Sequence, residues 1–135
     1  MEPGLRKLIR DYQSAVARAV AELKSGGIVA PDSNRGWSLN GMAQRGVLPS
    51  GATYAKHGYG CHVSLADGEV DFDFGDSGEI DGFDGWRLWR YAEPRSDIYG
   101  PTSYAELDDQ LKSLHSQGIL RKDPQGSLYY LGHDA

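Results

Sequence analysis

The stretch that decides the fold runs from Tyr59 to Phe74 and reads YGCHVSLADGEVDFDF. Apolar and polar residues alternate on both sides of Asp67-Gly68, and an Asp-Gly pair between two alternating runs is a strong signal of a β-hairpin. With Asp67 and Gly68 as the two loop residues, the apolar residues face one another as Leu65–Val70, Val63–Phe72 and Cys61–Phe74. We therefore expect one apolar face that packs against the core.

The second face of this hairpin is polar in the same register. Ser64 lies opposite Asp71, and His62 lies opposite Asp73. Residues directly opposite one another on neighbouring strands interact. His62 and Asp73 are therefore expected to form a cross-strand pair.

Acidic residues are concentrated in and after the hairpin. No Lys or Arg interrupts the segment 67–84, which we call the acidic segment, and its acids are Asp67, Glu69, Asp71, Asp73, Asp76, Glu79, Asp81 and Asp84. Like charges this close repel one another, and a folded domain usually disperses them. Two interpretations follow. The segment is a solvated surface supported by Arg87, Arg90 and Arg95, or it complements a basic cleft on a partner.

A calcium loop is a third interpretation of the acidic segment. Counted from Asp73 as the first position of a hand-type loop, side chains with oxygen atoms fall at positions 5, 9 and 12, namely Ser77, Asp81 and Asp84. Position 3 is Gly75, which offers no side-chain ligand, and a strand precedes the loop where a helix is required. Both departures argue against calcium, and no metal is expected.

His57, Cys61 and His62 lie in the short motif HGYGCH. Such residues could form a soft metal site with Asp73 as a fourth ligand, or a cysteine nucleophile with a histidine base. Because Cys61 and His62 are neighbours on a predicted strand, their side chains point to opposite faces. A thiol on the apolar face is usually inert, so structural roles are expected for all three residues.

The N-terminal helix is the clearest helical element. From Gly4 to Ser25, apolar residues recur every three or four positions, at Leu5, Leu8, Ile9, Tyr12, Val16, Ala19, Val20 and Leu23. That spacing predicts a helix with one buried face, and Gly26-Gly27 predicts its end.

A second helix is predicted over residues 103–117. Ser103 and Glu106 form a capping box at its start, and Gly118 is placed to end it. The residues expected to form its buried stripe are Tyr104, Leu107, Leu111 and Leu114.

Other segments carry weaker patterns. Residues 28–55 have no sustained period and suggest loops and short strands. Residues 86–91 fit either a strand or a short helix, and 94–101 form a connector. Residues 119–131 predict a closing hairpin around a turn at 123–126.

The composition and charge of the chain limit the classes of protein to which it can belong. The chain has 135 residues, 39% of them hydrophobic, and a formal net charge of −5. Its length and composition suit a single domain over 1–135, and its charge argues against a general binder of nucleic acid or of anionic membranes. Cys61 is the only cysteine, residues 1–10 lack an apolar signal core, and no run of about 18 apolar residues occurs. A cytoplasmic protein is expected.

A winged-helix interpretation of the last helix and the closing hairpin would imply DNA binding. That helix carries three acidic residues over 106–109 against Lys112, whereas a recognition helix offers Arg, Lys, Asn or Gln to DNA. No nucleic-acid partner is therefore expected.

Three motifs resemble those of a family of small bacterial proteins of unknown function. They are His57-Gly-Tyr-Gly-Cys61, Val70-Asp-Phe-Asp-Phe-Gly75 and Gly82-Phe-Asp-Gly-Trp-Arg-Leu88, and the likeness extends to the last helix and the strand 128–131. Small acidic members of such families are often encoded beside toxin domains, and the chain is similar to immunity proteins of that kind. The resemblance implies a binding protein and supplies no catalytic residue.

These observations together predict an α+β fold. One antiparallel sheet is expected to contain both hairpins, with the helices 4–25 and 103–117 on its apolar face. The predicted function is a cytoplasmic immunity-type protein that neutralises a toxin domain with a basic cleft, without a cofactor, and no oligomeric state is predicted. The residues expected to contact the partner are Asp71, Asp73, Asp76, Glu79, Asp81 and Asp84, with Trp86 or Trp89 as an aromatic anchor.

The alternative function is a small hydrolase or transferase that uses Cys61 and a histidine. The two functions differ in what they require of Cys61. An enzyme needs an exposed thiol that ionises readily, whereas a binding protein leaves the thiol packed in the core.

Overall fold

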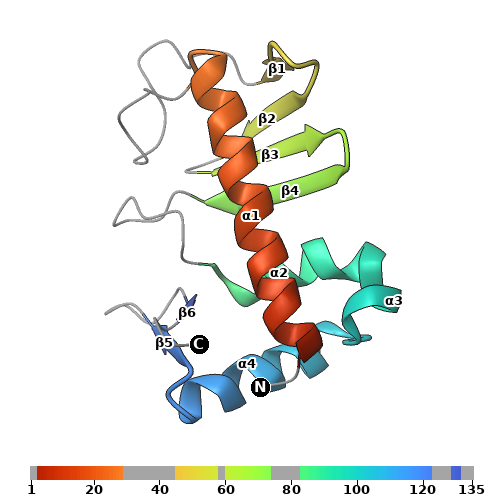
Figure 1. The fold of residues 1–135 in the computed structure, drawn as a ribbon, viewed down its shortest axis with the longest axis vertical. Coiled ribbons are helices and arrows are strands. Elements are labelled where there is room, and N and C mark those ends of the chain that lie inside the picture. Colours follow the sequence, from red (N-terminus) through yellow and green to blue (C-terminus); the bar gives the residue numbers. More distant parts are fainter. Residues whose placement is uncertain (1–2, 29–44, 58–59, 74–82, 123–128, 132–135) are drawn as a thin grey trace. The chain divides into compact units, whose positions relative to one another are not determined.

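The computed structural model describes residues 3–28, 45–57, 60–73, 83–122 and 129–131 (Figure 1). In chain order the elements are α1 (Pro3–Ser25), β1 (Arg45–Val47), β2 (Thr53–His57), β3 (Gly60–Leu65), β4 (Gly68–Asp73), α2 (Gly85–Ala92), a 3₁₀ turn η1 (Glu93–Arg95), α3 (Ser96–Tyr99), α4 (Tyr104–Ser116), β5 (Leu120–Lys122) and β6 (Tyr129–Leu131). This arrangement confirms the predicted α+β class. The chain forms two compact units: the sheet unit, residues 13–80, and the helical unit, residues 1–12 with 81–135.

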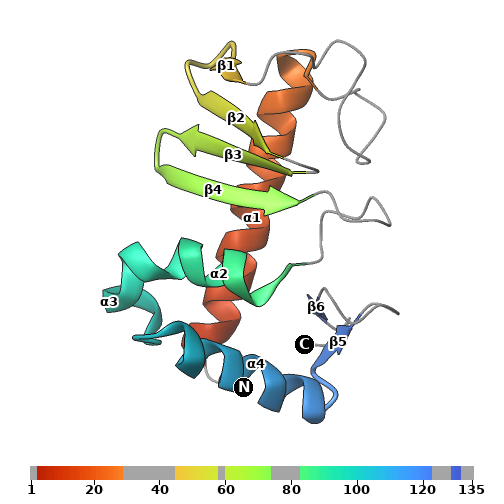
Figure 2. The same cartoon turned by 180° about the vertical axis from the view of Figure 1, so that it is seen from behind.

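The sheet unit contains a four-stranded antiparallel sheet in the order β1-β2-β3-β4. Residues 13–25 of α1 lie across one face of this sheet, as the two opposite views show (Figures 1 and 2). The apolar residues that this packing buries are Ala15, Val16, Ala19, Val20 and Leu23 on α1 and Tyr54, Cys61, Val63, Val70 and Phe72 on the strands. Burial of Cys61, Val63, Val70 and Phe72 confirms the predicted apolar face at these positions. Leu65 is half-buried, and Phe74 lies outside the described residues.

The hairpin register differs from the predicted one by two residues. Val63 pairs with Val70 and Cys61 pairs with Phe72, so that Ala66 and Asp67 form the loop. The predicted loop would require Asp67 to adopt a positive φ, but no described residue other than glycine does so, and Gly68 takes φ 138° instead. Because the side-chain period of a strand is two, the shift exchanges the partners and leaves each residue on its predicted face.

The helical unit is built on α2, α4 and the first part of α1. The segment 86–91, whose type the sequence left open, is helical because Asp84 caps it: its side chain accepts a hydrogen bond from the Arg87 amide at 2.7 Å. The connector 94–101 contains η1 and α3. The large buried residues of this unit include Leu8, Ile9, Phe83, Leu88, Leu107, Leu111 and Leu120.

The closing hairpin is the main departure from the predicted architecture. Strands β5 and β6 form a separate two-stranded sheet instead of extending the larger one. Phe83 and Tyr129 exchange two backbone hydrogen bonds, of 3.0 and 2.8 Å, that join this small sheet to the start of α2. Two strands cannot bury a face by themselves, and here α4 supplies a surface for β5.

The expectation that α4 covers the four-stranded sheet is wrong, since α4 packs against α2 and β5 in the helical unit.

Helix α4 confirms the predicted ends and corrects the predicted stripe. The Ser103 side chain accepts from the Glu106 amide at 3.1 Å, and Gly118 has φ 80° directly after the helix. The buried stripe consists of Leu107, Leu111 and Leu114. Tyr104 was expected in this stripe, but it lies in the first turn and is 37% exposed.

Candidate functional site

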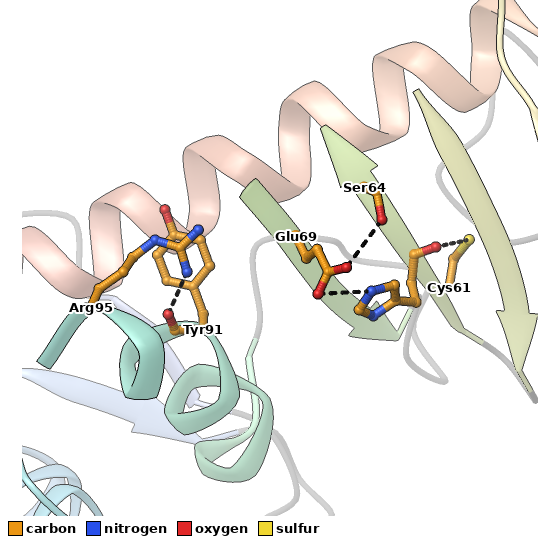
Figure 3. Close-up of polar contacts among 6 residues, drawn as sticks. Cys61, Ser64, Glu69, Tyr91 and Arg95 are labelled. Carbon is orange, nitrogen blue, oxygen red and sulfur yellow. Dashed lines mark hydrogen bonds and ion pairs between the residues drawn. The ribbon is translucent and has the colours of Figure 1, made fainter. Parts of the chain in front are cut away.

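Cys61 belongs to the core of the sheet unit. Its side chain is fully buried, opposite Phe72 on β4, and its Sγ lies 3.7 Å from the carbonyl oxygen of His62 (Figure 3). Burial raises the pKa of the Cys61 thiol from 9.0 to about 12, and the Asp71 carboxylate acts in the same direction. Thiolate is therefore scarce at neutral pH, which is the opposite of what a nucleophilic cysteine requires.

His62 lies on the other face of the sheet and pairs with a different acid from the predicted one. Its Nε2 is 3.5 Å from the Glu69 carboxylate, which also accepts a 3.4 Å hydrogen bond from Ser64 (Figure 3). In the observed register Asp71 stands opposite His62, whereas Asp73 stands opposite Gly60. The predicted pair of His62 with Asp73 is therefore wrong, because the register is shifted by two residues.

The same residues were candidates for a metal site. Among the parts of the chain that the structure describes, no group of three His, Cys, Asp or Glu side chains is arranged to hold a metal ion. His57 ends β2 opposite Gly60.

The face of the sheet that carries His62 is accessible to solvent on all four strands and carries mostly polar side chains, and we call it the polar face. The register aligns two rows of residues across it, Val47–Thr53–Ser64–Glu69 and Arg45–Ala55–His62–Asp71. All eight side chains are exposed or half-buried. The polar face therefore presents a positive charge on edge strand β1 and negative charges on edge strand β4.

A trough of about 430 Å³ lies on the polar face. Short side chains from the two central strands form its floor, at Thr53, Ala55 and Ser64. Arg45 and Val47 line it from β1, and His62 and Glu69 line it on the side of β4. The two sides of the trough carry opposite charges, Arg45 on β1 and Glu69 on β4.

The remaining acids predicted to bind a partner have different environments. Asp84 caps α2 and forms a 3.2 Å ion pair with Arg87. Asp76, Glu79 and Asp81 lie outside the described residues, and for Asp73 the structure defines only its place in β4.

Asp67, which opens the acidic segment, is held by a cation from the same unit. Its carboxylate lies 2.6 Å from Arg18 of α1, and both side chains are exposed. A surface ion pair of this kind contributes little stability, but it reduces the charge that Asp67 offers to a partner.

The two tryptophans predicted as anchors differ in exposure. Trp86 is 50% exposed and packs edge-on against Tyr104 with ring centroids 5.2 Å apart. Trp89 is only 7% exposed and belongs to the core of the helical unit. Of the two tryptophans, only Trp86 exposes a large part of its side chain to solvent.

Basic residues were expected to support the acidic segment, and their roles also differ. Arg87 does so through Asp84. Arg95 instead donates a 2.7 Å hydrogen bond to the Tyr91 carbonyl, and its guanidinium lies 4.1 Å from the centre of the Tyr91 ring (Figure 3). Arg90 is exposed on α2.

A family model described as a domain of unknown function (DUF6896) matches residues 5–131. The chain belongs to this family. The comparisons with curated proteins and with solved structures found no significant match.

Membership of this family confirms one part of the resemblance seen in the sequence, namely an uncharacterised domain that covers nearly the whole chain. None of the described helices is both long enough and apolar enough to cross a bilayer.

Sequence reasoning missed several polar contacts that the fold creates. Tyr99 donates a 2.7 Å hydrogen bond to Asp11, and burial together with this bond raises the pKa of the Tyr99 phenol. Arg45, which lines the trough, also escaped notice because it lies on a three-residue strand. Such a short strand shows no alternation that could have placed Arg45 on a face.

Proposed function

We propose that the chain is an immunity-type protein of the cytoplasm. It binds a toxin domain and neutralises it by placing the carboxylates of β4 and of the following acidic segment against a basic cleft. The observation that carries this proposal is the position of Glu69 and Asp71. Both acids lie on the polar face of an edge strand, while Val70 and Phe72 beside them are buried.

Burial of the alternate residues gives the two carboxylates a rigid support. Val70 and Phe72 fix the strand against the core, so Glu69 and Asp71 lose little freedom when a partner binds, and preorganisation of this kind favours affinity. The net charge of −5 adds a long-range attraction toward a basic surface.

The test uses the protein encoded by the gene next to that of this chain. Its C-terminal domain is expressed in a bacterial host, alone and together with this chain, and growth is measured. We expect arrest of growth by the domain alone and rescue by this chain, with a complex that can be purified. A domain that neither arrests growth nor binds would overturn the proposal.

The contribution of the acids is measured with charge-reversed variants of equal net charge. Glu69→Lys combined with Asp71→Lys should weaken binding by about a hundredfold, since like charges that face one another across an interface cost several kcal/mol. The matched control combines Asp97→Lys with Asp109→Lys, two exposed positions of the helical unit. If both double variants bind equally, the overall charge and not the polar face drives association.

Loss of folding is separated from loss of binding by a milder variant. Glu69→Gln combined with Asp71→Asn keeps the size of both side chains and removes only their charge. Melting curves are recorded for every variant, and equal affinity of this neutral variant and the wild type would contradict a role for these carboxylates.

A further inference from the structure

The two sides of the trough differ in more than the sign of their charge. Glu69 is engaged within the chain, by Ser64 at 3.4 Å and by His62 at 3.5 Å. For Arg45, by contrast, no ion pair occurs within the described part of the chain. The adjacent Val47 is 73% exposed, which makes it the most exposed of the large apolar side chains described.

An exposed guanidinium beside an exposed aliphatic side chain is an unusual feature on an otherwise acidic protein. Arginine is among the residues that dominate binding energy at interfaces, and its planar guanidinium matches a carboxylate in a two-bond geometry. A partner that binds only to the negative charges of this protein would gain no affinity from Arg45. The β1 side of the trough therefore fits a different chemical group from the β4 side.

The dimensions of the trough restrict what it can hold. Neighbouring strands lie about 4.8 Å apart, so the backbones of β1 and β4 are separated by roughly 14 Å across three spacings. The floor of small residues at Thr53, Ala55 and Ser64 allows a backbone to approach closely. A polypeptide segment that runs along the strands, between the two edges, fits this width.

We propose that the trough receives one segment of the partner protein, which presents a carboxylate to Arg45 and a basic side chain to Glu69. This inference rests on the proposed function and adds to it the orientation in which the partner segment lies between β1 and β4. The opposite charges of the two edges fix which side of the partner segment faces β1, and Val47 supplies apolar contact on that side.

The experiment changes the sign of Arg45 and asks in which direction the affinity moves. If the partner is attracted by negative charge alone, Arg45→Glu makes the net charge of the protein more negative by two and tightens binding. If a partner carboxylate contacts Arg45, the same change weakens binding by about tenfold or more, because like charges then face one another. The probe is the C-terminal domain encoded by the neighbouring gene, and affinity is measured by titration calorimetry.

Three further variants make the result specific. Arg45→Lys keeps the charge and should retain most of the affinity, whereas Arg45→Gln should lose an intermediate share. Arg121→Glu makes the same charge change at an exposed position of β5 and should leave affinity unchanged or slightly increased. Melting temperatures of all variants show whether β1 remains folded.

The outcomes separate this inference from the proposed function. Weaker binding by the Lys variants of Glu69 and Asp71 together with tighter binding by Arg45→Glu would overturn the inference and leave the proposed function standing. No binding by the wild type would overturn both. A wild-type dimer in light scattering that Arg45→Glu dissociates would also overturn the inference, since the trough would then hold a second copy of this chain.

Discussion

The environment of Cys61 bears on both functions that the sequence left open, a binding protein and a small hydrolase or transferase. Its thiol is fully buried beside Phe72, and the pKa is raised to about 12 by that burial. His62, the base nearest in sequence, lies on the opposite face of the same strand. A nucleophile and its base must lie within hydrogen-bond reach, and these two side chains do not.

Replacement of Cys61 tests its structural role. Cys61→Ser places a hydroxyl in an apolar site, and we expect a loss of about 1–3 kcal/mol in the free energy of unfolding with partner binding retained. Urea unfolding at neutral pH provides the measurement, and Cys61→Ala controls for loss of the sulfur atom alone. Abolished binding with unchanged stability would instead indicate a chemical role for the thiol.

The raised pKa of Cys61 predicts a dependence of stability on alkaline pH. In the unfolded chain the thiol ionises above its ordinary pKa of 9.0, whereas in the folded protein it stays protonated up to about pH 12. Between these values the unfolded state binds fewer protons, so the free energy of unfolding falls as the pH rises, by up to about 1.4 kcal/mol per pH unit. Below pH 9 this contribution is fully present.

Comparison with Cys61→Ala isolates this effect from the other groups that titrate at high pH. Unfolding of both proteins is followed from pH 8 to about pH 10.5, and the wild type should lose stability more steeply. Parallel curves would show that the thiol is accessible to solvent. Because the thiol is buried, we also expect the native wild type to react slowly with a thiol reagent.

At the scale of elements, Asp84 illustrates an acid whose role lies in folding. It was expected to contact a partner, and in the structure it caps α2 and pairs with Arg87. Asp84→Ala should therefore lower the free energy of unfolding by about 1–2 kcal/mol, and Asp84→Asn should recover most of that loss because Asn also caps helices. Thermal melts of the two variants check this.

The capping role also predicts the effect of these variants on binding. Asp84→Asn removes the charge and keeps the cap, so equal affinity of Asp84→Asn and the wild type would assign Asp84 to folding alone. A large loss of affinity in Asp84→Asn, at unchanged melting temperature, would place this carboxylate in the interface.

The elements that could be predicted are those with enough residues to show a period. Helix α1 and the alternating strands β3 and β4 were located correctly, as was the N-cap of α4 at Ser103. The predicted capping box is only half formed, because the Glu106 carboxylate accepts from Thr102 instead of from the Ser103 amide. The hairpin register was not predicted correctly, because alternation alone cannot distinguish two pairings whose partners differ by two residues. That choice depended on the backbone of Asp67 and Gly68, a local property that the pattern does not contain.

Less of the candidate site than of the fold could be predicted, because part of the site lies on short strands. The polar face of the hairpin followed from alternation, and so did the opposite directions of Cys61 and His62. The trough requires β1 and β2 beside that hairpin, and these strands have only three and five residues. Pairing between short strands is decided by tertiary packing, which a local sequence pattern does not show.

At the scale of the whole molecule, the net charge of −5 governs how a partner approaches. If the polar face meets a basic cleft, association is steered by electrostatics, and the on-rate should fall by about tenfold or more as salt rises from about 50 to about 500 mM. Stopped-flow mixing with the C-terminal domain encoded by the neighbouring gene measures this rate. A rate that does not respond to salt would exclude electrostatic steering.

Helix α1 is continuous from Pro3 to Ser25, yet its residues on either side of position 12 belong to different compact units. This division has a consequence for synthesis on the ribosome. The apolar residues Leu5, Leu8 and Ile9 pack in a unit whose other part, residues 81–135, is translated later. At about 5–20 residues per second, that wait lasts several seconds. Residues at the start of α1 thus leave the ribosome well before the later residues that complete their unit.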